Sequence, residues 1–423
     1  MKPQNIILIS FTKVVDVAGN VAKGSAEVYA FELAKLAVSL GHVVNVLQFD
    51  LTPSKFTVMD INVTTCQWSS SLIARRPRKL VLDYLSSFDA TSTIVIFCSE
   101  AVVVRADDFY TIMIQHKIGF DYPPSGKSLS ILRHFKSGRY AHWLLRQGVL
   151  RAANSVDCTV CVDYVYPTWL KTICYVPPCR VLTIPNFSRV CERDIPPRES
   201  YSRVLFARRM VTRRGCWIMA SATRLLLAKY PRLCVTFAGE GPEKRAMVEM
   251  FSGELRVKFI EYENEDALRI NATHDIAVIP SLASEGTSLS LLEAMAAKCA
   301  VVAAPVGGIS NIVIDNHNGL VCEPTAESIA AKVALLHTNP ALAMRLSACG
   351  YSTVLESFSY TRWCRLWAGI LGENKSRVRA HQEVFSYDCP LLNSLRSEQR
   401  CESAQRNGVS KIAVIFACKT RRV

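Results

Sequence analysis

Two glutamates near residue 285 stand at a spacing that suits a ligand rich in hydroxyl groups. Glu285 and Glu293 have seven residues between them, and carboxylate oxygens accept hydrogen bonds from sugar hydroxyls. Between them lie Gly286, Thr287 and Ser288, small residues that can expose backbone N–H groups at a helix start, where the helix dipole favours a phosphate. The segment therefore predicts a ligand that is both sugar and phosphate.

The same segment also has a purely structural interpretation. Ser290 and Glu293 are three residues apart and fit a capping box, in which the serine and the glutamate satisfy each other's free amides at a helix start. The flanking sequence favours a binding site instead, because the apolar runs 275–280 and 299–305 predict buried strands on either side of the helix. Open α/β sheets bind their ligands beyond the carboxyl ends of such strands.

Further motifs lie upstream of this segment. Arg209 and Arg214 follow a predicted strand, and residues 237–242 and 257–259 read Phe-Ala-Gly-Glu-Gly-Pro and Val-Lys-Phe. In order and spacing, these motifs and the paired glutamates resemble the retaining nucleotide-sugar glycosyltransferases of family 4, which have the GT-B fold. Arg209 matches the arginine of the family and Arg214 its lysine, whereas Arg208 stands where the family has a glycine.

The resemblance implies roles for individual residues. Arg209 and Arg214 would stabilise the diphosphate that gains charge as the glycosidic bond breaks. Glu285 would lie beside the transferred sugar, Glu293 would bind the ribose hydroxyls, and the amides of residues 286–288 would hold phosphate or sugar oxygens. The resemblance thus implies that the second half of the chain binds the nucleotide-sugar donor.

The first half of the chain offers fewer candidates. Gly24 precedes a predicted long helix and matches the glycine loop of the family, although a serine follows it where a second glycine is usual. A lone histidine is more often structural, but His116 directly follows an apolar strand, where the family places a histidine that reaches the sugar. Asp121 is a candidate on the acceptor side. Arg208 and Arg213 are expected to belong to a solvated basic loop.

Length and composition fit a two-domain globular protein. The 423 residues exceed one ordinary core, and 50% of them are hydrophobic. The formal net charge of +14 indicates anionic ligands or an anionic surface. Nucleic acid is the least favoured of the anionic partners and is not expected, because zinc-finger spacing, RNP-type aromatic motifs and basic heptads are all missing from the sequence.

The cysteine pattern indicates a reducing compartment. The 16 cysteines are dispersed and sit mostly in apolar strands, unlike the framework of a small secreted domain. The pair Cys158 and Cys161 is interpreted as two buried thiols, because no second pair or histidine stands at metal-ligand spacing. The N-terminal apolar run is too short for a secretory signal and no run suits a spanning helix, so a cytoplasmic location is expected.

Strands and helices alternate along the chain, which predicts parallel sheets with helices on both faces. The expected fold class is α/β, with two doubly wound Rossmann-like domains that face each other across a cleft, as the GT-B resemblance implies. The expected parts are listed in chain order: 1–190, an acceptor-side domain; 191–202, a linker; 203–355, a nucleotide-sugar domain; 356–371, a helix that crosses back; and 372–423, a disordered tail.

The expected activity is transfer of a sugar from a UDP- or GDP-sugar to an acceptor hydroxyl with retention of configuration, in polysaccharide or glycolipid synthesis for the cell envelope. No cofactor is expected, and since no Asp-x-Asp stands at a strand end, the reaction is expected to be metal-independent. The acceptor would be a glycan or a lipid-linked sugar. The basic, aromatic stretch 133–151 fits either an anionic membrane surface or a solvated helix face.

Two other activities remain open on the sequence. A sugar-nucleotide epimerase of the same architecture would convert the donor without an acceptor. A non-catalytic subunit would bind the nucleotide sugar without turnover.

Overall fold

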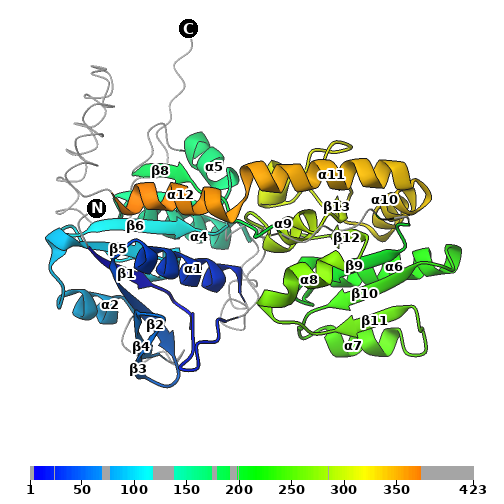
Figure 1. Cartoon of the computed structure of the whole chain (residues 1–423). Coiled ribbons are helices and arrows are strands. Elements are labelled where there is room, and N and C mark those ends of the chain that lie inside the picture. The colour runs from blue at the N-terminus through cyan, green and yellow to red at the C-terminus, as the bar shows by residue number, and fades with distance from the viewer. Residues whose placement is uncertain are drawn as a thin grey trace, which may run out of the picture. The chain divides into compact units, whose positions relative to one another are not determined.

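The computed structural model describes residues 4–22, 24–68, 77–117, 138–173, 179–190, 198, 200–283 and 285–372. Most of the predicted linker 191–202, the predicted tail 372–423 apart from its first residue, and the acceptor-side candidate Asp121 lie outside the described residues. Two sheets, whose strands are parallel except for one hairpin in the first sheet, together with flanking helices account for the ordered elements of the described chain (Figure 1).

Within the described residues, the first sheet has the strand order β3-β4-β2-β1-β5-β6-β7-β8. The strands are β1 (Asn5–Ile9), β2 (Val43–Asp50), β3 (Ser54–Val58), β4 (Ile61–Gln67), β5 (Thr93–Phe97), β6 (Tyr110–Gln115), β7 (Cys158–Cys161) and β8 (Arg180–Thr183). The helices are α1 (Ser25–Ser39), α2 (Pro77–Leu85), α4 (Gly138–Ala153) and α5 (Val165–Ile173). All neighbouring strands are parallel except β3 and β4, which form an antiparallel hairpin.

The β3–β4 hairpin was not predicted from the sequence. Its strands are only partly buried and rich in threonine and other polar residues, so they lack the continuous apolar runs of the buried strands. The turn places Met59 and Asp60 at φ of 51° and 61° without the Asn-Gly or Asp-Gly pair that marks such turns in a sequence. The hairpin lies at the edge of the sheet, beyond β2.

The second sheet is parallel throughout, in the order β11-β10-β9-β12-β13-β14. Its strands are β9 (Arg203–Ala207), β10 (Cys234–Ala238), β11 (Val257–Ile260), β12 (Ile276–Ile279), β13 (Ala300–Ala303) and β14 (Leu320–Val321). Its helices are α6 (Cys216–Lys229), α7 (Lys244–Met250), α8 (Ala267–Ala272), α9 (Leu289–Ala296), α10 (Ala326–Thr338) and α11 (Pro340–Ser357). The central strands are buried on both faces, as covered parallel strands require.

The strand order of the second sheet fixes where a ligand can bind. Chain direction across the sheet reverses between β9 and β12, because β10 and β11 extend to one side of β9 while β12, β13 and β14 extend to the other. At such a switch point the loops after the two central strands diverge and leave a crevice. Arg208 and Glu285 follow these two strands.

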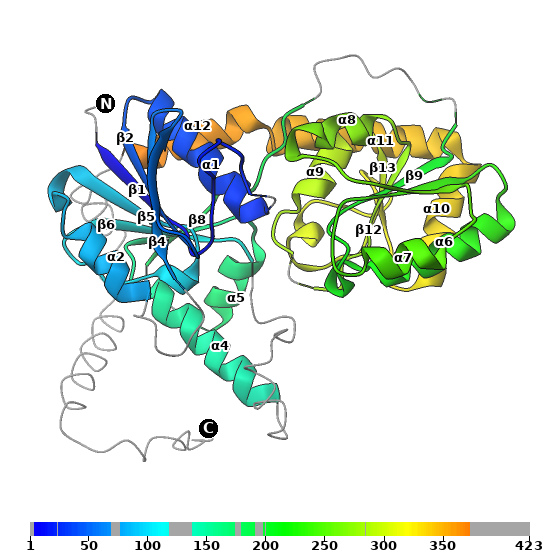
Figure 2. The same cartoon turned by 90° about the horizontal axis from the view of Figure 1, so that it is seen from below.

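Helix α12 (Tyr360–Leu371) packs against the first sheet's helix α1 (Figure 2). The Trp367 Nε1–H donates to the Tyr29 hydroxyl at 2.7 Å, and the Tyr360 hydroxyl donates to Glu32 Oε2 at 3.0 Å. The Trp363 and Tyr29 rings meet edge to face at 5.2 Å between centroids. The C-terminal end of the described chain therefore buttresses α1.

The described cysteines are free thiols, and Cys158 and Cys161 are both buried in β7. Burial raises the pKa of the Cys161 thiol, which disfavours the reactive thiolate. Across the ranges that the structure describes, no helix combines the length and the apolar character needed to cross a bilayer.

Candidate active site

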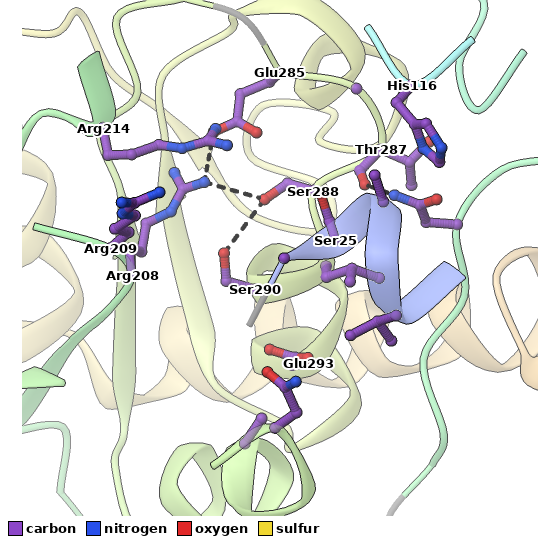
Figure 3. Close-up of a pocket in the computed structure, with 18 of the residues that line it drawn as sticks. Ser25, His116, Arg208, Arg209, Arg214, Glu285, Thr287, Ser288, Ser290 and Glu293 are labelled. Atoms are coloured by element: carbon purple, nitrogen blue, oxygen red, sulfur yellow. Dashed lines mark hydrogen bonds and ion pairs between the residues drawn. The ribbon is translucent and has the colours of Figure 1, made fainter. Parts of the chain in front are cut away.

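A pocket of about 450 Å³ lies at the carboxyl ends of β9 and β12. Its lining includes the start of α1, the residue after β6, the loop after β9, and the segment that leads into α9 (Figure 3). All predicted site residues in the described chain line this pocket: Gly24, His116, Arg209, Arg214, Glu285, Gly286, Thr287, Ser288 and Glu293. The chain fold thus gathers side chains that are up to 269 residues apart (Gly24 to Glu293) in the sequence.

The loop after β9 places two arginines in different environments. Arg208 is buried, with 5% of its side chain exposed, and its guanidinium donates to Ser281 Oγ and to Glu285 Oε1, both at 2.5 Å. The prediction that Arg208 is solvated is therefore wrong. Arg209 is exposed, and its guanidinium has no hydrogen-bond or ion-pair partner among the described residues.

Backbone contacts with the loop after β10 shape this arginine pair. The Arg208 N–H donates to the Ala238 carbonyl at 2.9 Å, and the Met210 N–H donates to the Glu240 carbonyl at 2.7 Å. Between these bonds, Gly239 has φ of 129°, and a Cβ there would clash with the Arg208 carbonyl. The glycine of the Phe-Ala-Gly-Glu-Gly-Pro motif is therefore needed for close passage of the two loops.

Glu285 is a buried, ionised carboxylate. Arg208, Arg214 and the Ser281 hydroxyl all contact its Oε1, the hydroxyl at 2.5 Å. Burial by itself would raise the pKa of Glu285, but the adjacent Arg208 and Arg214 guanidinium groups lower it to about 2. Glu285 therefore carries its full charge at neutral pH and is compensated by more than one cation.

The start of α9 rules out the capping box. The helix begins at Leu289 with Ser288 as its N-cap, and no side chain caps it, so Ser290 lies inside the first turn rather than before it. The Ser288 hydroxyl instead contacts the Ser290 hydroxyl at 3.4 Å. Because the first amides of a helix have no partner within the helix, this N-terminus can bind an anion.

Gly286 allows the two halves of the pocket to approach each other closely. A Cβ at Gly286 would clash with the His116 carbonyl and with the Val162 side chain. Next to it, the Thr287 hydroxyl donates to the Val162 carbonyl, and Asn186 Nδ2 donates to the Thr287 carbonyl at 2.5 Å. The loop before α9 is thus fixed by the ends of first-sheet strands.

Glu293 lies in the second turn of α9 and differs sharply from Glu285. Burial raises the pKa of Glu293 to about 7, with Arg208 opposing the shift. The pKa of Tyr262, which follows β11, is raised mainly by burial and further by the charge of the nearby Glu293. Near neutral pH, Glu293 is therefore balanced between an acceptor-only carboxylate and a carboxylic acid that can also donate.

His116 faces the pocket from the end of β6 as a neutral group. Burial lowers the pKa of its imidazole to about 4, even though a hydrogen bond to the Cys98 backbone opposes the shift. Its ring packs edge to face against Tyr29 at 5.4 Å between centroids. Its Nε2 is a buried atom with no hydrogen-bond partner among the described residues.

Gly24 is the N-cap of α1, and no side chain caps that helix either. The Glu27 carboxylate lies against Gly24, where a Cβ would clash with it, and accepts a hydrogen bond from the Thr12 hydroxyl at 2.6 Å. Glu27 therefore places a negative charge beside this part of the pocket.

Besides Arg208, the residues that sequence reasoning did not assign to the site include Glu27, Asn186 and Tyr262, which line the pocket, and Ser281, which supports it. Ser281 follows the predicted strand in the loop that contains Glu285, and this position was a usable signal. The others carry no local signal, because they come from segments that only the tertiary fold brings near α9. In the described chain, no group of three or more His, Cys, Asp and Glu side chains is arranged to hold a metal ion.

The second half of the chain is similar in sequence to known proteins. Residues 201–339 match the family described as glycosyl transferases group 1. A curated relative, glycogen synthase of Mycobacterium tuberculosis, is 27% identical over 169 residues, which are 39% of this chain and 41% of that enzyme. The matches thus span less than half the length of the curated relatives.

Solved structures resemble the chain over most of its length. Sucrose-phosphate synthase from Thermosynechococcus elongatus has a TM-score of 0.68 and 17% identity, over 87% of this chain and 98% of that chain. The Anabaena protein HepE in complex with UDP-glucose has a TM-score of 0.64 and 17% identity, over 86% and 99% of the two chains. These likenesses confirm the predicted GT-B fold.

Proposed function

We propose that this chain, which carries a glycosyl transferases group 1 domain at residues 201–339 on a GT-B fold, transfers a hexose from a nucleoside-diphosphate sugar to an acceptor hydroxyl with retained anomeric configuration. The donor is a UDP- or GDP-sugar. The acceptor is a glycan or a lipid-linked sugar in polysaccharide or glycolipid synthesis.

The observation that carries the proposal is an unpaired guanidinium beside an uncapped helix. Arg209 is exposed to the pocket without a partner in the described chain, and Arg214 lines the same pocket. The start of α9 offers amides that no side chain caps. Guanidinium groups and helix amides are the groups that bind a diphosphate, so the pocket suits an anion that carries a sugar.

The two glutamates contact the two sugar parts of the donor, the ribose and the transferred sugar. Glu293, in the second turn of α9, accepts hydrogen bonds from the ribose hydroxyls. Glu285, ahead of the helix, faces the transferred sugar together with His116 from the other side of the pocket. The UDP-glucose complex of the related Anabaena fold supports a donor of this chemical class.

In the reaction, the bond between the anomeric carbon and the diphosphate oxygen breaks while the acceptor oxygen bonds to the same carbon on the same face. Arg209, Arg214 and the α9 amides stabilise the negative charge that develops on the leaving diphosphate. That diphosphate takes the proton of the acceptor hydroxyl. Neutral His116 accepts a hydrogen bond from a sugar hydroxyl or donates one to it, without adding charge.

The positive charge for this step comes from guanidinium groups, so we propose that turnover is independent of divalent metal. Full activity in the presence of EDTA is the expected result. A complete loss that added Mg²⁺ or Mn²⁺ restores would refute metal independence.

The function is tested by finding the donor first. The purified full-length protein is screened by thermal shift against UDP, GDP and ADP and against the glucose conjugate of each. The donor that stabilises best is then incubated with hydroxyl acceptors, and nucleoside diphosphate release and the anomeric product are measured by NMR. Inverted product would refute retention, conversion of the donor without an acceptor would indicate an epimerase, and binding without turnover would indicate a binding subunit.

We propose a cytoplasmic location, on the basis of the dispersed cysteines. We also propose peripheral binding to an anionic membrane, on the basis of the charge of +14 and the basic stretch 133–151. Flotation with vesicles that contain phosphatidylglycerol, compared with vesicles of phosphatidylcholine alone, tests the binding. Equal absence from both vesicle fractions would refute it.

A further inference from the structure

Arg208 links three parts of the pocket that meet at the switch point. Its Nη1 donates to Ser281 Oγ after β12, and its Nη2 donates to Glu285 Oε1. A weaker contact of 3.5 Å joins the same Nη2 to the hydroxyl of Ser288, the N-cap of α9. The side chain is too buried and too occupied to serve as a free anion ligand like its neighbour Arg209 (Figure 3).

We infer that Arg208 is a positioning residue for the transfer reaction: it fixes Glu285 in its ionised form and turns the Ser288 hydroxyl away from the amides of α9. The inference rests on the proposed function, because it assigns Arg208 a task in that same pocket. It concerns a position where the family that this chain resembles has a glycine, so the resemblance itself implies no such task.

The contacts on Glu285 show how the carboxylate is oriented. Arg208, Arg214 and Ser281 all contact Oε1. Oε2 is not engaged by these three groups. A carboxylate held by three donors on one oxygen cannot rotate freely, so the second oxygen presents a fixed direction to a sugar hydroxyl.

The charges around the loop explain why a buried arginine is useful there. An ionised Glu285 would repel a diphosphate at contact distance. Arg208 and Arg214 together outweigh that single negative charge, and Arg209 adds a further positive charge at the pocket surface. The loop can therefore hold a carboxylate for the sugar and still attract the diphosphate.

The N-cap of α9 supplies the second part of the task. A serine at this position normally accepts a hydrogen bond from an amide in the first turn and so caps the helix. Here Ser288 makes no such bond, and its hydroxyl contacts Arg208 and Ser290. The amides of the first turn stay open to a phosphate because the hydroxyl is held elsewhere.

Stability alone gives a weak reason for this arrangement. Burying an ion pair costs desolvation that largely offsets the attraction, so apolar residues of similar size are often as stable. The benefit expected from Arg208 is therefore geometric and electrostatic, and it must be measured through the ionisation of Glu285.

Several other groups titrate or carry charge around this loop. They come from the turn before α6, the loops after β9, β11, β6 and β7, and α9: Arg214, Arg209, Tyr262, His116, Asp163 and Glu293. Glu293 titrates close to neutral pH, so the test compares Arg208 variants in a background that contains Glu293→Gln as well as in the wild type. His116 is common to all variants.

The test measures turnover against pH for Arg208→Met, which keeps length without charge, and for Arg208→Lys, which keeps charge without the planar fork. Arg208→Met is expected to lower turnover about 10²-fold through misplacement of Glu285. Loss of the cation raises the pKa of Glu285, so the acid limb of its activity moves to higher pH by about 1–3 units. Arg208→Lys moves the limb less, and added methylguanidine partly restores Arg208→Gly.

A second readout does not depend on turnover. Because the pKa of Glu285 is low in the folded protein, its stabilisation is fully present above the pKa of an unfolded glutamate and is lost as the pH falls from about 5 towards 2. In Arg208→Met, where the folded pKa of Glu285 is higher and closer to its unfolded value, the unfolding temperature should fall less over this interval than in the wild type. Glu285→Gln should abolish this difference between the two proteins.

The outcomes separate the inference from the proposed function. The inference would be overturned if the wild type is active and Arg208→Met keeps the wild-type pH dependence of both turnover and unfolding temperature. Even if that variant is slow, only a general structural role would then remain. A folded wild type without turnover on any sugar nucleotide would overturn the proposed function and the inference with it.

Discussion

The two sides of the pocket hold their functional groups by different means. On the side of the second sheet, Arg208, Arg214 and Glu285 fix one another through ion pairs, and charge is concentrated. On the side of the first sheet, His116 is neutral and is held by packing against Tyr29, which in turn bonds to Trp367 of α12.

This difference matches the two ends of the proposed donor. A diphosphate needs fixed positive charge, and cations that are already ordered by their neighbours lose little freedom when it binds. A sugar has neutral hydroxyls, which a neutral imidazole can bind without attracting a competing anion. The comparison therefore predicts large effects from charge changes on one side and smaller, packing-dependent effects on the other.

The largest effect is expected from the exposed arginine of the charged side. Arg209→Ala should lower turnover about 10²-fold or more, because one electrostatic stabiliser of the leaving diphosphate is lost. The unfolding temperature should stay unchanged, since Arg209 contacts no partner in the described chain. Arg245→Ala, on the exposed face of α7, is the control. Equal turnover of the two variants would contradict the large effect that is predicted for the charged side of the pocket.

A smaller loss is expected on the neutral side. His116→Asn should lower turnover about tenfold, which corresponds to one lost hydrogen bond of roughly 1.4 kcal/mol. Because the pKa of His116 is about 4, the ratio of wild-type to variant turnover should stay constant between about pH 6 and 8. His317→Asn, at an exposed position in the second half, is the control; a ratio that changes around pH 6.5 would show that His116 titrates there.

The pH dependence of donor binding tests the other glutamate. With a pKa of about 7, Glu293 gains a proton as the pH falls below neutral, so it accepts fewer hydrogen bonds and donor affinity should fall several-fold by about pH 5.5. Glu293→Gln should bind more weakly but without this pH dependence, as titration calorimetry can show. An identical pH dependence in both proteins would assign it to another group.

The same shift predicts an opposite trend in stability. A carboxyl group whose folded pKa is raised stabilises the protein in its protonated form, and this contribution is lost as the pH rises from about 5 to 7. The unfolding temperature of the wild type should therefore fall relative to Glu293→Gln over that interval. Parallel curves for the two proteins would contradict the raised pKa.

The smallest effect concerns the support of His116. Tyr29→Phe removes the acceptor of the Trp367 Nε1–H bond and should lower the free energy of unfolding by about 1 kcal/mol, measured by urea titration. Turnover should fall less than in His116→Asn, because the ring that packs against His116 remains. Tyr164→Phe, at an exposed position before α5, is the control. If the loss of turnover, converted to a free energy, exceeds the loss of unfolding free energy, the α12 contact governs His116 directly.

Much of the fold followed from local pattern. The apolar runs 275–280 and 299–305 predicted buried strands, and β12 and β13 lie within them, because parallel strands that are covered on both faces have no polar side. The β3–β4 hairpin escaped prediction because edge strands alternate polar and apolar residues and its turn lacks glycine.

The site residues show a similar division. Glu285, Glu293, Arg209 and Arg214 were predicted from type and spacing, since a phosphate and a sugar require cations and acceptors near a helix start. Arg208 was assigned to solvent because a run of basic residues usually forms a solvated loop. In the structure its guanidinium lies under the pocket, where no sequence neighbour of Arg208 could have indicated Glu285 as its partner.

The sequence by itself determined the buried strands and the helix start at which the predicted site residues lie, because strand burial and helix starts depend on short-range pattern. The tertiary structure alone decided that Glu285 is fully ionised whereas Glu293 titrates near neutral pH. Both carboxylates lie within one short segment, but only Glu285 meets two guanidinium groups from the loop after β9. The pKa of a buried carboxyl group depends on the charges packed against it, and packing across the switch point supplied those charges.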